Sequence, residues 1–217
     1  MYLENINGPE DVKKLNDEQM TALAEEMRAA LLKRASIHGG HFGPNFGMVE
    51  ATIALHYVFE SPKDKIVYDV SHQTYPHKML TGRKDAYLYE EHYDDVSGYS
   101  NPHESEHDHF TVGHTSTSVS LALGLAKARD LKGEDGNVIA VIGDGSLSGG
   151  DLTGRQSLVA ISLLWSMTMT CRLLKIMVVC TRISDCFVRR KERQSAICFV
   201  RWDLTTVMWM REMMCVR

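Results

Sequence analysis

Residues 138–150 read VIAVIGDGSLSGG. An apolar run that ends in Gly-Asp-Gly is typical of a buried parallel strand, and ligands of open α/β sheets bind at the carboxyl ends of such strands. This position suits Asp144 to hold Mg²⁺, which prefers hard oxygen ligands and often bridges to diphosphate oxygens. The flanking glycines let the backbone approach a phosphate closely. A plain strand-to-helix turn is the alternative, because Gly-Asp-Gly alone is common.

Outward from this turn, the apolar residues follow two periodicities. A second short run, IVYDV at 66–70, favours another buried strand. Apolar residues recur at helical spacing over 17–36, 46–59 and 116–131. Residues 84–112 are polar and indicate a long surface loop. Strands that alternate with helices predict an α/β fold with a parallel sheet flanked by helices.

The first predicted helix carries its own start and stop signals. Asn16 followed by Gln19 resembles a capping box, in which each side chain binds the backbone N–H of the other residue. Gly39 and Gly40 are expected to stop the helix. The 116–131 helix is expected to begin with Thr and Ser caps.

Two histidine-bearing segments are expected near the same sheet edge. The segment DVSHQTYPHKMLTGR at 69–83 follows the first strand, so His72 should lie at the edge that carries Asp144. His41 lies in the glycine-rich segment GGHFGPNFG at 39–47. Because histidine titrates near neutral pH, both side chains can move protons on substrate oxygens. For a single histidine, a satisfied structural role is the alternative.

A third segment, HFTVGHTSTSVSLALG at 109–124, places Gly113-His114-Thr115 directly before a helix. The free N–H groups at a helix start favour anions, so this turn is expected to contact an anionic ligand. His56 lies on an apolar helix face and is expected in the core.

Length and composition exclude several classes of protein. The chain has 217 residues, is 44% hydrophobic and 24% charged, and carries a net charge of −4. This is ordinary for a globular protein and argues against wholesale disorder, collagen-like repeats or nucleic-acid binding driven by bulk charge. No stretch approaches the ~20 apolar residues that span a bilayer, and the N-terminus lacks the apolar segment of a secretory signal.

The composition changes abruptly near residue 150. Residues 1–150 carry 13 Lys and Arg against 23 Asp and Glu, whereas residues 151–217 carry 11 against 5. All five Cys and all three Trp lie in the second segment, and residues 155–217 contain no Gly, Pro, Asn, His or Tyr. The Cys spacing has no C-x-x-C pattern, which disfavours a metal site or a disulfide framework. The two segments look like products of different selection.

The quoted motifs together resemble 1-deoxy-D-xylulose-5-phosphate synthase, a thiamine-diphosphate enzyme family of the transketolase superfamily. The resemblance covers roughly residues 10–150, in order, and the SHQ-x-YPHK and GH-[ST]-STS segments are far more specific than Gly-Asp-Gly. It implies a transferase that condenses pyruvate with glyceraldehyde 3-phosphate and releases CO₂, for isoprenoid, thiamine and pyridoxal precursors. Residues 1–150 would then be the N-terminal part of a thiamine-diphosphate-binding fold.

The resemblance also implies roles for individual residues. His72 and the Gly113-His114-Thr115 turn would contact thiamine diphosphate, with His41 near the reacting centre. Asp144 would bind Mg²⁺. Gly145 and Ser146 would line the diphosphate. The family usually has Ser at the position of Thr115, and a hydroxyl is kept.

The resemblance stops near residue 150. The family needs an Asn some 25 to 30 residues after the Gly-Asp-Gly Asp as a second Mg²⁺ ligand, and this chain has no Asn after Asn137. The family's Glu that activates the aminopyrimidine ring also has no counterpart. We therefore expect this chain to be inactive by itself.

A shift in reading frame explains the anomalous segment 151–217. When the last base of each codon is read with the first two of the next, Met167-Thr168 and Met169-Thr170 each give Asp. Residues 162–183 can then spell a buried strand that runs into Asn-Asp-Asn. Other choices at degenerate codons remain open, and a genuine divergent segment rich in Cys, Met and Arg is the alternative.

Two other functions stay open at this point. One is another thiamine-diphosphate enzyme, such as a transketolase or a 2-oxo-acid dehydrogenase component. The other is a non-catalytic, truncated paralogue that binds a full-length partner. In the intact family we expect a cytoplasmic homodimer that uses small-molecule substrates and contacts neither nucleic acid nor membrane.

Overall fold

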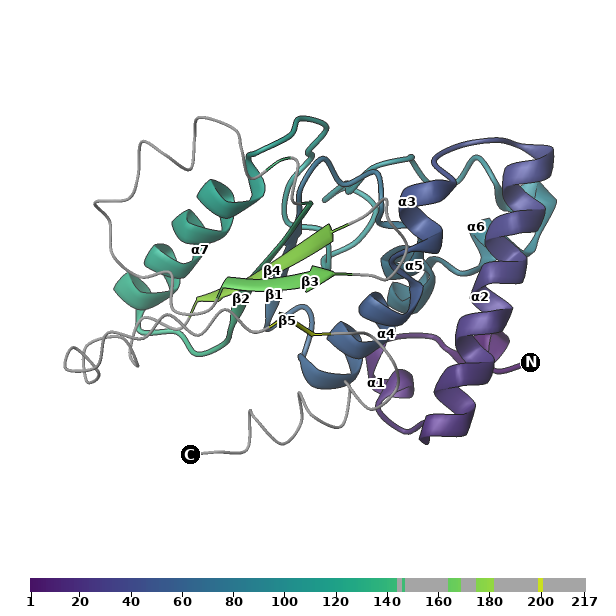
Figure 1. The fold of residues 1–217 in the computed structure, drawn as a ribbon, viewed down its shortest axis with the longest axis horizontal. Coiled ribbons are helices and arrows are strands. Elements are labelled where there is room, and N and C mark those ends of the chain that lie inside the picture. Colours follow the sequence, from purple (N-terminus) through teal and green to yellow (C-terminus); the bar gives the residue numbers. More distant parts are fainter. Residues whose placement is uncertain (144–145, 147–163, 169–174, 182–198, 201–217) are drawn as a thin grey trace.

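The structure is a computed structural model that describes residues 1–143, 146, 164–168, 175–181 and 199–200 (Figure 1). The helical elements are η1 (Leu3–Asn5), α1 (Pro9–Val12), α2 (Asp17–Ile37), α3 (Gly43–Phe46), α4 (Val49–Val58), α5 (Tyr75–Lys78), the π-type turn η2 (Met79–Arg83), α6 (Asp85–Leu88), η3 (Glu90–His92) and α7 (Ser118–Lys132). The strands are β1 (Lys65–Tyr68), β2 (Val138–Gly143), β3 (Leu164–Thr168), β4 (Lys175–Thr181) and β5 (Phe199–Val200).

The sheet is built around the predicted parallel pair. Its strand order is β1-β2-β4-β3-β5, and β1 pairs with β2 in parallel, with Lys65 opposite Val138 and Tyr68 opposite Val141. The expected parallel α/β arrangement is confirmed for this pair. Strand β4 then joins β2 in the antiparallel sense, and β3 pairs antiparallel with β4.

Helices cover both faces of the parallel pair, as Figure 1 shows for α7 on one side and α4 on the other. Because side chains alternate across a strand, Ile66 and Tyr68 pack with Ile139 and α4 residues, whereas Val67 packs with α7 residues. Burial on both faces explains why these strands are apolar throughout rather than alternating.

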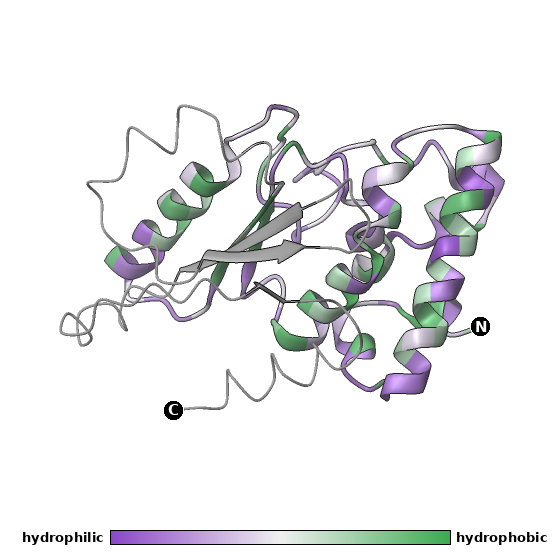
Figure 2. Ribbon diagram, viewed as in Figure 1, coloured by the Kyte–Doolittle hydropathy of each residue, from purple (hydrophilic) through white to green (hydrophobic). Residues whose placement is uncertain are grey.

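The capping box of α2 is confirmed. The Asn16 side chain accepts from the Gln19 N–H at 2.9 Å, and the Gln19 side chain accepts from the Asn16 N–H at 2.9 Å. The helix ends at Ile37, and Gly39 and Gly40 follow at positive φ, where glycine is favoured. Figure 2 shows hydrophobic and hydrophilic residues interleaved along α2 and α7, as expected of helices with one buried face.

The prediction of a surface loop over 84–112 is wrong in part. The segment contains α6 and η3, and it buries Tyr87, Tyr93 and Asp108. Some of its charged residues lie in buried ion pairs, as Asp108 does with Arg83, whereas others such as Asp94 are exposed, and composition alone does not separate the two. The predicted helix over 46–59 is also shorter than expected, because α3 and α4 divide this region. Within the described residues, no helix combines the length and apolar character that a bilayer crossing requires.

Candidate functional site

The turn after β1 has a strained backbone. Val70 and Ser71 have φ of 58° and 65°, values that residues other than glycine rarely adopt and that are costly for a β-branched side chain. Ser116 has a φ of 67°, and these three are the non-glycine residues at positive φ in the described part of the chain. Such strain persists where surrounding contacts over-determine the backbone, and it clusters at functional sites.

Asp69 connects this turn to the start of α7. Its carboxylate accepts from the N–H groups of Ser116 at 3.0 Å, Thr117 at 2.9 Å and Ser118 at 3.0 Å. The expected Thr or Ser cap is wrong in this respect, because Thr117 makes no side-chain capping bond. The anion at the start of α7 is therefore a carboxylate of the protein itself.

Ser71 adds a second connection between the same segments. Its hydroxyl donates to the Val112 carbonyl at 2.5 Å and accepts from the Ser100 N–H at 3.1 Å. Val112 directly precedes the Gly113-His114-Thr115 turn. The turn after β1 thus holds the residue before the Gly113–Thr115 segment, Val112, and the residue after it, Ser116.

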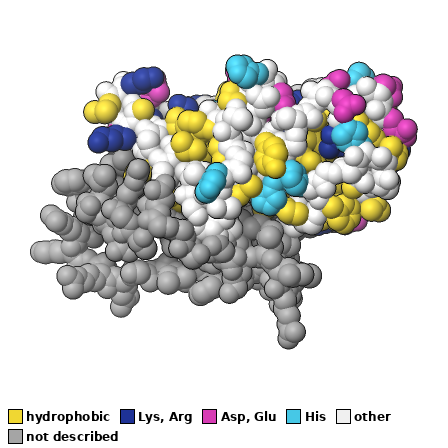
Figure 3. All heavy atoms as spheres, turned by 90° about the horizontal axis from the view of Figure 1, so that it is seen from above, with side chains coloured by type: hydrophobic (Ala, Val, Ile, Leu, Met, Phe, Trp, Pro, Cys, Tyr) yellow, Lys and Arg dark blue, Asp and Glu magenta, His cyan; other side chains and the backbone are white. Residues whose placement is uncertain are grey.

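Gly113, His114 and Thr115 are all exposed. His114 Nδ1 lies 2.8 Å from the Thr115 carbonyl, and the Thr117 hydroxyl donates to the His114 carbonyl at 3.2 Å. Among the described residues, a Cβ at Gly113 would meet no atom within 4 Å, so they leave space open in front of the turn. Figure 3, seen from above, shows histidine side chains at several points on this face of the molecule.

The two predicted catalytic histidines lie together. The His41 and His72 rings meet edge to face, with centroids 5.6 Å apart. Asn45, fully buried, positions both, because its side-chain amide donates to the His41 carbonyl at 2.6 Å and to the His72 carbonyl at 2.9 Å. The side-chain oxygen of Asn45, Oδ1, in turn accepts a hydrogen bond from the Tyr75 N–H at 2.9 Å.

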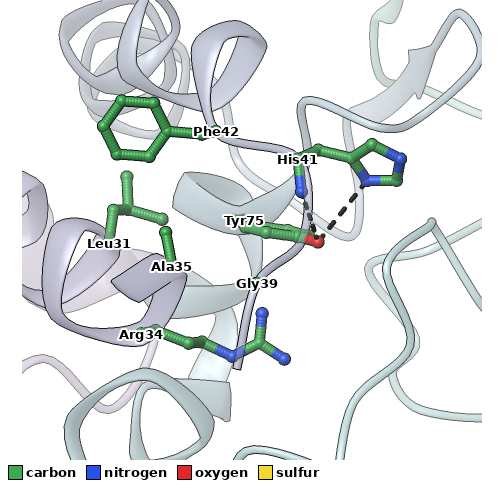
Figure 4. Close-up of a pocket in the computed structure, with 7 residues that line it drawn as sticks. All are labelled: Leu31, Arg34, Ala35, Gly39, His41, Phe42 and Tyr75. Atoms are coloured by element: carbon green, nitrogen blue, oxygen red, sulfur yellow. Dashed lines mark hydrogen bonds between the residues drawn. The ribbon is translucent and has the colours of Figure 1, made fainter. Parts of the chain in front are cut away.

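His41 also lies between two tyrosine hydroxyls. Tyr75 Oη is 3.4 Å from His41 Nδ1 and accepts from the His41 N–H at 3.3 Å, as Figure 4 shows beside a small pocket that both residues line. Tyr99 Oη lies 3.4 Å from His41 Nε2. These contacts orient the His41 ring and leave the residue partly exposed.

His72 is the predicted site residue with the most altered acid–base behaviour. Burial lowers its pKa, and the neighbouring His41 lowers it further. Its Nδ1 is buried and has no hydrogen-bond partner among the described residues, and the same is true of Gln73 Oε1 next to it. A neutral imidazole with one unpaired nitrogen can accept or donate a bond to a bound ligand.

The predicted metal-binding turn is only partly described. Asp144 and Gly145 lie outside the described residues, so the structure does not test them. Ser146 is described, and its carbonyl accepts from the Ser116 hydroxyl at 2.5 Å. Hydrogen bonds therefore link the segment of Asp69 to Ser116, and Ser116 to Ser146. Among the described residues, no three His, Cys, Asp or Glu side chains are grouped to hold a metal ion.

A buried ionic network supports the loop that carries Tyr99. Arg83 pairs with Asp108 at 2.8 Å, and the buried ammonium of Lys78 pairs with Glu104 at 2.6 Å. His77 Nε2 lies 3.0 Å from Asp108. His56, buried as predicted, lies behind it, with its Nε2 2.8 Å from His77 Nδ1.

The comparisons with known proteins identify the family of the chain. A sequence profile described as 1-deoxy-D-xylulose-5-phosphate synthase matches residues 3–155. The chain belongs to the 1-deoxy-D-xylulose-5-phosphate synthase family. Proteins of that name from Symbiobacterium thermophilum and Carboxydothermus hydrogenoformans are 51% identical over 150 residues and 55% identical over 148 residues. A third, from Dictyoglomus turgidum, is 53% identical over 150 residues.

The chain matches only the front of these synthases. The three alignments cover 69%, 68% and 69% of this chain, but 23%, 24% and 24% of the respective synthases. The chain thus spans about a quarter of the length of the curated relatives it matches.

Sequence reasoning missed the residues that hold the site together. Asn45, Asp69, Tyr75 and Tyr99 were not predicted, although three of them lie inside quoted motifs. For Asp69 a signal existed, since a carboxylate at the end of a parallel strand can cap a neighbouring helix. For Tyr99 there was none, because only the folded loop brings it to His41.

Proposed function

We propose that residues 1–150 form the N-terminal part of a synthase that condenses pyruvate with glyceraldehyde 3-phosphate, with loss of CO₂, using thiamine diphosphate and Mg²⁺. The observation that carries this proposal is the contact between the His41 and His72 rings, together with the hydrogen bonds that join the turn after β1 to the residues on either side of the Gly113–Thr115 turn. Family membership and the names of the relatives support it.

The described residues leave space and a hydrogen-bonding side chain for a heteroaromatic cofactor. A ligand oxygen or nitrogen could bond His72 Nδ1 in place of the adjacent Gln73 side chain, and the space that the described residues leave at Gly113 admits a group close to the backbone. Bound thiamine diphosphate would supply the electron sink that decarboxylation requires. The protein residues would hold it and handle protons, with Asp144 on the Mg²⁺ and Gly145 and Ser146 beside the diphosphate.

The two histidines are suited to different tasks. His72, whose pKa is lowered by burial, stays neutral near pH 7 and can donate or accept a hydrogen bond without carrying charge. His41 is partly exposed, and Tyr75 and Tyr99 orient both of its ring nitrogens. It is placed to move a proton at a substrate oxygen, as a general acid–base group must be.

We propose further that residues 151–217 are out of frame and that this chain alone is inactive. The end of the family match at residue 155 supports this boundary, as does the change in composition near residue 150. The whole family enzyme is proposed to act in the cytoplasm as a homodimer.

The test is titration calorimetry of the purified chain with thiamine diphosphate, with and without Mg²⁺. We expect saturable binding that Mg²⁺ strengthens and that His72→Ala weakens at least tenfold, with no CO₂ release from pyruvate. His103→Ala is the matched control. His103 is an exposed histidine outside the proposed site, so its substitution should leave the affinity for thiamine diphosphate unchanged. A folded chain that takes up no thiamine diphosphate contradicts the proposal, and full-rate turnover contradicts the expected inactivity.

A further inference from the structure

We propose that Asp69 is a positioning residue for cofactor binding, which sets the Gly113–Thr115 turn relative to His72. The inference rests on the proposed function and goes beyond it, since the contacts of Asp69 described above were given no part in cofactor binding. Asp69 itself points away from a direct ligand role, because its carboxylate is occupied by three backbone N–H groups.

Every polar group of Asp69 joins a different part of the site. Its N–H donates to the Val141 carbonyl on β2 at 2.8 Å. Its carbonyl accepts from the Gln73 side chain at 2.9 Å, on the segment that carries His72. Its carboxylate holds the first turn of α7. One residue thus connects two strands, the histidine turn and the helix behind the predicted cofactor turn.

The charge of Asp69 is balanced locally. The residue is 1% exposed, and no Lys or Arg side chain in the described part of the chain pairs with it. A buried carboxylate is costly unless charge or hydrogen bonds compensate. Here the N–H groups at the start of α7 and the helix dipole provide the compensation. Any shift of α7 along its axis would leave the carboxylate unsatisfied, so the geometry is tightly set.

The strained residues show where this constraint acts. Val70 and Ser71 follow Asp69 directly, and Ser116 is one of its donors. Ser116 then donates its hydroxyl to the Ser146 carbonyl in the predicted diphosphate turn. Asp69 therefore fixes Ser116, a strained residue that directly follows the Gly113–Thr115 turn and bonds the segment of Ser146.

Asp64 provides a matched control at the opposite end of β1. It is also a buried carboxylate, and it accepts from the Asn137 N–H at 2.5 Å and the Glu60 N–H at 2.7 Å. Asp64→Asn should cost stability much as Asp69→Asn does. It should leave the cofactor turn untouched, because its partners lie at the amino ends of the strands.

The experiment compares Asp69→Asn and Asp64→Asn in the full chain. In Asp69→Asn, one carboxylate oxygen is replaced by an NH₂ group, which cannot accept the hydrogen bonds that the backbone N–H groups donate in the wild type. We expect amide hydrogen exchange over residues 112–121 to become at least tenfold faster, and the Kd for thiamine diphosphate with Mg²⁺ to rise at least tenfold. Asp64→Asn should change neither by more than twofold, at a temperature where both variants are folded.

Each outcome is decisive. Unchanged exchange over residues 112–121 in Asp69→Asn, or a Kd within twofold of the wild-type value, overturns the inference. Equal effects of both variants on the Kd also overturn it, because they indicate a general loss of stability. If the wild-type chain binds no thiamine diphosphate, the proposed function fails, and the exchange result alone still decides whether Asp69 holds the turn.

A second variant covers the case in which Asp69→Asn does not fold. Ser116→Gly keeps the Asp69 contact and relieves the positive φ, but removes the hydroxyl that bonds Ser146. We expect a folded protein with at least fivefold weaker binding of thiamine diphosphate. Wild-type affinity in Ser116→Gly would show that the connection from Asp69 through Ser116 does not reach the cofactor.

Discussion

The side-chain amide of Asn45 donates to the main-chain carbonyl of His72 at 2.9 Å. The same amide donates to the His41 carbonyl at 2.6 Å, so one buried side chain joins the two histidine-bearing segments. Thirty-one residues separate the two histidines in the sequence. Their proximity therefore depends on a polar group that neither segment shows by itself.

Asn45→Ala should destabilise the protein and weaken its site together. The change removes the donor to the partly buried His41 and His72 carbonyls and the acceptor of the buried Tyr75 N–H, and a buried group left without its partner costs on the order of 1–3 kcal/mol. We expect a clear fall in the urea midpoint and a higher Kd for thiamine diphosphate. Asn5→Ala is the control, because Asn5 makes an exposed bond to the Met1 carbonyl. Equal midpoints for the two variants would contradict this role of Asn45.

Lys78→Met should be much more damaging than a surface lysine change. The Lys78 ammonium is fully buried and bonds Glu104 and the Ser97 carbonyl, so its loss leaves a carboxylate without its nearest cation. Breaking a buried pair costs about 3–5 kcal/mol, whereas a surface pair contributes about 0–1 kcal/mol. Lys33→Met, which removes an exposed pair with Glu90, is the comparison. Similar free energies of unfolding for both variants would show that the network is not important for stability.

Acid should destabilise the fold below about pH 6.5, the pKa of an unperturbed histidine. Burial lowers the pKa of His56 and His77, and it lowers the pKa of His109 to about 4. As the pH falls from 6.5 toward these lowered values, the unfolded chain takes up protons that the folded chain does not. Stability from these groups is thus present above pH 6.5 and lost on acidification.

The pH dependence can be assigned to His56 by substitution. His56→Gln should reduce the drop in urea midpoint between pH 7.5 and pH 5, since it removes one proton-binding group from the unfolded chain. His92→Gln should not reduce the drop, because the Asp95 hydrogen bond raises the pKa of this exposed histidine. An unchanged drop in His56→Gln would place the acid sensitivity elsewhere.

Local sequence signals were sufficient for much of the fold. The capping box at Asn16 and Gln19 and the apolar strands at 66–70 and 138–142 act through near neighbours, and the structure has these elements close to where they were predicted. The segment 84–112 differs from the predicted surface loop because part of its polarity belongs to buried groups, such as Asp108, which pairs with Arg83. Pairing between distant residues leaves no periodic pattern in the sequence.

The same distinction holds for the site. The sequence points to His41, His72 and the Gly113–Thr115 turn because each lies in a distinctive motif, and their roles stay predictions. The residues that connect them, Asn45 and Asp69, act through backbone groups of other segments. Backbone groups are identical in every residue, so the sequence does not reveal which of them need a partner.

The frameshift proposal makes a prediction about the gene itself. If residues 151–217 are out of frame, a high-accuracy read of the DNA across codons 140–220 will show one base missing or extra relative to this translation. The corrected frame should continue through Asn-Asp-Asn and supply an Asn, the residue that the resemblance implies as a second Mg²⁺ ligand. The corrected protein should then release CO₂ from pyruvate in the presence of glyceraldehyde 3-phosphate, and His72→Ala should abolish this activity. DNA that confirms the present chain would overturn the frameshift proposal. The Cys-rich segment would then be a genuine part of the protein. Co-purification would test whether the protein binds a partner such as a full-length synthase.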